Sequence, residues 1–181
     1  VTQSYPTKAR NMVEKKQVLY DLRTTYTGPF IVEDFYMEVD NWIKEKGFEK
    51  EPKKKMEHVA KSGKKIELVI EAHRKLDGMH HGIVILRALL DNVREVTIKK
   101  GNKKIRINNG DVYINIDGFI QSHIHGSFWQ AKPIYYLIRA FIDHYIYNFW
   151  SFKWDGAVST DCHDLFKRIR SFFQLQKYKY E

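Results

Sequence analysis

Apolar and polar side chains alternate with a period of two over much of the chain between residues 65 and 125. Successive side chains of a β-strand point to opposite faces, so this alternation predicts strands with one apolar and one polar face. Antiparallel sheets commonly have one packed face and one solvated face. The alternating apolar residues of the two clearest runs are Ile66, Leu68, Ile70, Ile114 and Ile116. We therefore expect an antiparallel sheet whose apolar face carries these side chains.

Four groups of turn-forming residues divide the same part of the chain: Asp77-Gly78, Asp91-Asn92, Lys100-Gly101-Asn102 and Asn109-Gly110. Asn-Gly and Asp-Gly between strand-like runs are strong hairpin signals, because a tight hairpin turn needs positive φ. Together with two strand-like segments nearer the N-terminus, they predict about seven strands. The expected strands are residues 17–26, 56–61, 65–73, 80–90, 93–99, 103–108 and 111–123.

Three other segments repeat their apolar residues with the 3.6-residue period of an α-helix. These segments are residues 31–46, 133–150 and 160–176, and the last follows a break predicted at Asp155-Gly156. The second carries the longest apolar stripe, which only the inner face of the sheet is large enough to bury. The predicted fold class is therefore α+β. We expect a curved antiparallel sheet wrapped around a long C-terminal helix, with an additional terminal helix.

Length, charge and cysteine content limit the classes of protein to consider. A chain of 181 residues can bury a core as one domain, so we expect a single α+β domain at 17–181. Residues 1–16 are polar and basic, and we expect them to form a flexible arm. The formal net charge of +9 favours an anionic partner, such as RNA or an acidic protein surface. Cys162 is the only cysteine and fits a reducing, cytoplasmic compartment. Charged residues interrupt the most apolar run, 134–150, so we expect no membrane span.

The order of these elements resembles that of the helix-grip superfamily, which includes START lipid-transfer domains and polyketide-cyclase-like proteins. The resemblance covers residues 17–150 and consists of a strand, a helix, six antiparallel strands and a long helix. It implies an apolar cavity between a curved sheet and the last helix, where family members hold lipids, sterols or polycyclic products. Most members bind without catalysing a reaction. This chain differs in having one helix, where the family has two, between its first two strands, and in its extra terminal helix.

This resemblance leads to the first functional expectation, the binding or carriage of a hydrophobic or amphipathic small molecule without a cofactor. Arg139 is the group suited to an anionic head, but an ion pair with Asp143 at i, i+4 is the interpretation that we favour for it. The residues expected to line the pocket or core are Ile66, Leu68, Ile70, Ile114, Ile116, Ile134, Leu137, Ile138, Arg139, Phe141 and Tyr145.

A basic hairpin supports a second expectation. The basic residues Lys99, Lys100, Lys103, Lys104 and Arg106 stand together without an acid among them. They suit an accessory protein that docks on RNA or an RNA–protein assembly, because attraction to phosphates is independent of sequence. Lysines that protect a sheet edge from aggregation are the alternative interpretation.

Residues with potential chemistry give weaker indications. His123 and His125 would share one face of a strand and could be joined by Asp143 or His144 in a metal site, but no third ligand has reliable spacing. We therefore expect no metal, and read these histidines as lying at the rim of the sheet. Cys162 lies on an apolar helical stripe, which indicates a buried structural thiol, and solvated faces account for carboxylates such as Asp117. A cyclase- or hydratase-like enzyme on the same fold is a further alternative, without assigned catalytic residues.

Overall fold

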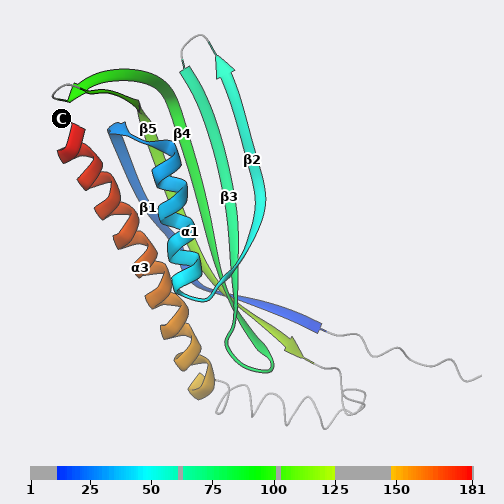
Figure 1. Ribbon diagram of the computed structural model, residues 1–181. Helices are drawn as coiled ribbons and strands as arrows, with labels where there is room; N and C mark the ends of the chain where they lie inside the picture. Colours follow the sequence, from blue (N-terminus) through cyan, green and yellow to red (C-terminus); the bar gives the residue numbers. More distant parts are fainter. Residues whose placement is uncertain (1–11, 61–62, 101–102, 125–147, 181) are drawn as a thin grey trace, which may run out of the picture.

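The computed structural model describes residues 12–60, 63–100, 103–124 and 148–180 (Figure 1). It consists of a five-stranded antiparallel sheet and two helices. The elements in chain order are β1 (Met12–Phe30), α1 (Val32–Glu45), β2 (Glu49–Ala60), β3 (Gly63–Lys75), β4 (His80–Lys100), β5 (Lys103–Ile124) and α3 (Asn148–Tyr180). Across the sheet the strands follow the order β1-β5-β4-β3-β2. The predicted α+β class and the antiparallel pairing are confirmed.

The prediction of about seven strands is wrong, because two of the predicted turns, Asp91-Asn92 and Asn109-Gly110, lie opposite each other in one β-bulge. Asp91 pairs with Asp111, and the register then shifts before Arg94. Asn92 has a φ of +51°, and a Cβ atom at Gly110 would lie only 2.8 Å from the Asp91 carbonyl oxygen. A bulge needs the same positive φ and close backbone approach as a turn, but it lets the strand continue. β4 and β5 are consequently long single strands in a sheet that is not strongly curled (Figure 1).

The N-terminal strands are also longer than the sequence indicated. Met12–Lys16, which the sequence placed in a flexible arm, are the first residues of β1, while residues 1–11 lie outside the described residues. β2 begins at Glu49, seven residues before the strand expected at 56–61, and all of its residues are exposed. It is an edge strand, and its lysines suit an edge that must not pair with another chain.

The helices confirm one prediction and correct another. α1 matches the helix expected at 31–46, and its apolar stripe of Phe35, Val39, Trp42 and Ile43 is buried. α3 runs without interruption through Asp155-Gly156, so the break predicted there is wrong. Glycine lowers helix stability by only about 1 kcal/mol, which packing over a helix of this length can offset. Neither helix in the described ranges has the length and apolar content needed to cross a membrane.

Both helices pack on the same face of the sheet, as Figure 1 shows. Phe173 of α3 is the centre of an aromatic cluster with Tyr26 and Phe30 of β1 and Phe35 of α1, at ring-centroid distances of 4.8 to 5.9 Å. Arg168 of α3 donates hydrogen bonds to two glutamates of α1, which raises the pKa of its guanidinium. The core therefore lies between one sheet face and the two helices.

We expect Gly118→Ala to lower the free energy of unfolding by about 1–3 kcal/mol. A Cβ atom at this β5 position would lie 2.8 Å from Sγ of buried Cys162 and 3.2 Å from a methyl group of Val158. Urea unfolding monitored by circular dichroism measures the loss. Adding Cys162→Ala removes the closest atom and should recover part of the stability. Equal stability of the wild type and the Gly118→Ala variant would contradict this packing.

Candidate functional site

The structure brings together the five sheet residues expected to contact a ligand. Their side chains lie on one face of β3 and β5, and all are buried in the core beneath α1 and α3. These residues are Ile66, Leu68, Ile70, Ile114 and Ile116. The partner residues expected on a long helix, Ile134, Leu137, Ile138, Arg139, Phe141 and Tyr145, lie outside the described residues. Ligand contact by this set stays a prediction.

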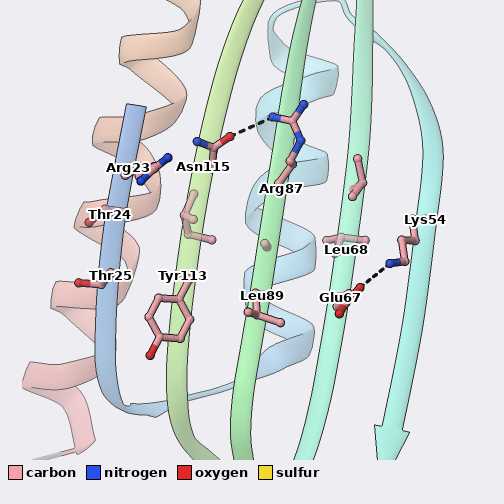
Figure 2. A pocket seen from close by; sticks show the side chains of 13 residues that line it. Arg23, Thr24, Thr25, Lys54, Glu67, Leu68, Arg87, Leu89, Tyr113 and Asn115 are labelled. Atoms are coloured by element: carbon pink, nitrogen blue, oxygen red, sulfur yellow. Dashed lines mark hydrogen bonds and ion pairs between the residues drawn. The ribbon is translucent and has the colours of Figure 1, made fainter. Parts of the chain in front are cut away.

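The clearest hollow among the described residues lies on the opposite sheet face, which no described helix covers (Figure 2). It has a volume of about 490 Å³ and reaches across all five strands. Apolar or partly apolar side chains from four strands form much of its wall. These are Thr25 of β1, Val69 of β3, Leu89 of β4 and Tyr113 of β5. We call this hollow the open-face hollow.

Two arginines border one end of the open-face hollow. Arg23 of β1 and Arg87 of β4 lie on either side of Asn115 of β5 (Figure 2). A second hollow of about 450 Å³ contains the same three residues and adds Tyr20, Asp21 and Asp117. The two hollows therefore meet at this pair of arginines.

A bulge in β1 builds the polar network under the arginines. Asp21 has a φ of +62° and lies within the register shift between Leu19 and Leu22, and its backbone N–H donates to Oδ1 of Asp117 at 2.8 Å. Nδ2 of Asn115 donates to the Asp21 carboxylate, which also pairs with Arg23. Arg87 pairs with the Asp117 carboxylate through Nη1, which also lies 3.0 Å from Oδ1 of Asn115. Each arginine is thus fixed by a carboxylate and held close to Asn115.

The network leaves hydrogen-bond donors unused at the hollow. A guanidinium group has five N–H donors. Of the nitrogens in these two guanidinium groups, only Nε of Arg23 and Nη1 of Arg87 make hydrogen bonds to side chains within the described part of the chain. The side chain of Arg23 is 70% exposed and that of Arg87 is 45% exposed. The remaining guanidinium nitrogens are therefore accessible to an anionic ligand.

The opposite rim of the hollow is electrically balanced. Nζ of Lys54 on β2 lies 2.5 Å from a carboxylate oxygen of Glu67 on β3. This hydrogen bond holds the pKa of Glu67 below its ordinary value. The unused guanidinium N–H donors are consequently at the arginine end of the hollow rather than at this rim.

Sequence reasoning missed this pair of arginines, and it misread Asp117. The Asp117 side chain is not on a solvated face, because the residue is only 6% exposed and is paired with Arg87. One signal was present in the sequence: Arg87 is the only charged residue in the otherwise apolar run from Ile83 to Leu90. The apolar residues on both faces of that run suggest a strand covered on both sides, but in the described parts of the chain the helices cover only one face.

The other candidate groups are less suited to chemistry. The Cys162 thiol is buried as expected, and burial raises its pKa to about 12, so it stays protonated and unreactive. Across the described ranges, no three His, Cys, Asp or Glu side chains are grouped so that they could hold a metal ion. His125 and His144 lie outside those ranges.

The basic residues expected to bind nucleic acid lie together at one end of the sheet. Lys99 and Lys100 end β4, and Lys103, Lys104 and Arg106 begin β5. Nη1 of Arg106 lies 3.5 Å from Oε1 of Glu95, an acid that precedes the basic cluster of residues 99–106 in the sequence. Their interaction with a nucleic acid stays a prediction.

Comparisons with known proteins do not identify a relative. No protein-family model, curated protein or solved structure matches this chain.

Proposed function

We propose that this chain binds an amphipathic anion, a molecule with one carboxylate or phosphate head and an apolar body, without catalysing a reaction. The proposal keeps the ligand class expected from the sequence but moves the ligand to the open-face hollow. The single observation that carries it is the pair of accessible guanidinium groups, Arg23 and Arg87, at the end of a largely apolar hollow.

The head group of the ligand would bind between the two arginines. A planar guanidinium offers paired N–H donors that match the two oxygens of a carboxylate or phosphate. Because Asp21 and Asp117 already fix the two guanidinium groups, little side-chain entropy is lost when the anion binds. The remaining donors of Arg23 and Arg87 would thus be preorganised for an anion.

The body of the ligand would lie along the wall of the hollow. Val69, Leu89 and Tyr113 come from three adjacent strands. The pairing register places their side chains on the same face of the sheet, because Leu89 pairs with Tyr113 and also with Glu67, two residues before Val69. Burial of apolar surface contributes about 25 cal/mol per Å², which favours a ligand with a hydrocarbon chain over a small inorganic anion.

Two further observations support binding without catalysis and the ligand class. Asp21, Asp117 and Glu67, the carboxylates around the hollow, are each engaged in an ion pair, so none is free to act as an acid or base. An antiparallel sheet packed against a long C-terminal helix is the general architecture that the helix-grip resemblance implied, and most proteins of that superfamily bind apolar or amphipathic molecules.

Calorimetric titration with a matched set of probes tests the ligand class. Laurate has both a charged head and an apolar body, dodecanol has the body alone and acetate has the head alone. We expect laurate or dodecyl phosphate, used below its micelle concentration, to bind at least 10-fold more tightly than dodecanol and acetate. Equal affinity for laurate and dodecanol would rule out recognition of the head group by the arginines.

Arg23→Ala should weaken laurate binding by about 10-fold, because a hydrogen bond to a charged group contributes about 1.5–3 kcal/mol and this side chain is largely exposed. Arg170→Ala is the matched control, since Arg170 is an exposed arginine on α3. The same titration measures both variants. A similar loss in the two variants would indicate a general effect of net charge and would exclude the proposed site.

A further inference from the structure

The far ends of β4 and β5 extend beyond the rest of the sheet as a two-stranded ribbon. β3 pairs with β4 only as far as Val93, and β1 pairs with β5 only as far as Asn108. Residues 94–100 and 103–107 therefore have only each other as strand neighbours. Figure 1 shows this ribbon bending away from β2 and β3 and toward the C-terminal end of α3. We call it the β4–β5 ribbon.

The β4–β5 ribbon holds more than half of the net charge of the chain. Residues 94–107 contain six basic residues and one acidic residue, which gives +5 of the total of +9. The register pairs Lys99 with Lys104 and Lys100 with Lys103. Like charges directly opposite each other destabilise a strand pair. The pairing of lysine with lysine at the tip therefore favours a role that needs the charge.

Protection of a sheet edge does not account for this charge pattern. Charged side chains, above all lysine, protect the edge of a sheet from pairing with another chain. On β2, an outer strand of the sheet, lysines are paired with acids: Lys50 pairs with Asp40, and Lys54 pairs with Glu67. On the ribbon, Glu95 is the one acid in the sequence from 94 to 107, and its Oε1 lies 3.5 Å from Nη1 of Arg106. The ribbon therefore has five more basic residues than acidic residues.

We propose that the β4–β5 ribbon docks on the phosphate backbone of a nucleic acid duplex. A two-stranded β-ribbon has dimensions that the major groove of B-form DNA, about 12 Å wide, can admit. Lysines along both strands would neutralise phosphates and release their counterions, independently of base sequence. Lys177 and Lys179 in the last turn of α3 add positive charge at the C-terminal end of that helix. This interaction is separate from the open-face hollow and does not depend on the proposed anionic small molecule.

Fluorescence anisotropy with a labelled 20-base-pair duplex, as DNA and as RNA, tests this proposal on the full chain over a series of salt concentrations. We expect Lys100→Gln, Lys103→Gln and Lys104→Gln combined to weaken binding at least 10-fold at low salt. Each phosphate contact contributes about 0.9 to the slope of log K against log salt for B-form DNA, so the slope should fall by about 2 to 3. An unchanged thermal midpoint confirms that the variant is folded.

A control triple variant, Lys44→Gln, Lys75→Gln and Lys167→Gln, removes the same charge from exposed positions away from the ribbon. It should bind the duplex within about twofold of the wild type at the same salt concentration. Equal weakening in the two triple variants would overturn the proposal, because net charge alone would then explain the binding. Binding of the wild type to heparin but to neither duplex would also overturn it, in favour of another kind of polyanion.

Discussion

Phe173→Ala should lower the free energy of unfolding by about 3–5 kcal/mol, the loss typical of a buried phenylalanine. Phe173 is 3% exposed, and its ring stacks on Tyr26 at 4.8 Å and on Phe35 at 5.5 Å. The substitution would leave a cavity where β1, α1 and α3 meet, and rings this rigid cannot collapse to fill it. Urea unfolding followed by far-ultraviolet circular dichroism measures the change.

Leu175→Ala provides the matched control for this prediction. Leu175 lies two residues further along α3 and is 69% exposed. Its truncation should change the free energy of unfolding by no more than about 0.5 kcal/mol. If Phe173→Ala were as mild as Leu175→Ala, α3 would not be the helix that covers the sheet, and the arrangement of the core would be wrong.

The period of the apolar residues was sufficient to predict the sheet and α1, because burial of one face leaves a direct pattern in the sequence. Ile66, Leu68 and Ile70 share one face of β3, and Phe35 and Trp42 share one face of α1. The strand count was not predictable from turn residues. Asn92 and Gly110 serve a bulge as well as they would serve a hairpin, and only the pairing of β4 with β5 distinguishes the two.

The candidate site was harder to predict because it depends on neighbours that are distant in the sequence. Asp21, Arg87 and Asp117 come from three strands, and the bulge in β1 is needed to bring the backbone of Asp21 to Asp117. No spacing of residues within one segment of the sequence predicts such a network. The extent of α3 was also missed, since Asp155-Gly156 has the composition of a helix end but lies within a helix held by tertiary contacts.

Arg74→Met should lower the free energy of unfolding by about 3 kcal/mol at pH 7, because it removes the partner of the buried Asp161 carboxylate from a partly buried ion pair. Arg74 of β3 pairs with the buried carboxylate of Asp161 on α3 and donates to the carbonyl oxygen of Lys46 at 3.1 Å. The guanidinium also lies over the ring of Phe48, 4.5 Å from its centroid. Without Arg74, Nζ of Lys46 at 3.9 Å is the cation that remains beside Asp161.

The loss caused by Arg74→Met should depend on pH. Burial raises the pKa of Asp161 in the folded chain, whereas Arg74 and Lys46 oppose that rise, so removing Arg74 should raise this pKa further. A carboxyl group whose pKa is higher in the folded chain than in the unfolded chain contributes to stability when the pH is below both pKa values. That contribution is lost as the pH rises through the folded-state pKa. The difference between the variant and the wild type should therefore be largest at pH 7 and smaller near pH 4.

Urea unfolding at the two pH values, with the double variant Arg74→Met and Asp161→Asn as the control, isolates the charge of Asp161. An amide keeps the size of the side chain but cannot ionise, so the double variant should regain stability at pH 7 and show little of the pH dependence. The lost contacts of Arg74 with Phe48 and Lys46 are the same in both variants and cancel from the comparison. A deficit of Arg74→Met that is equal at pH 7 and pH 4 would mean that packing, rather than the buried carboxylate, makes Arg74 necessary for joining β3 to α3.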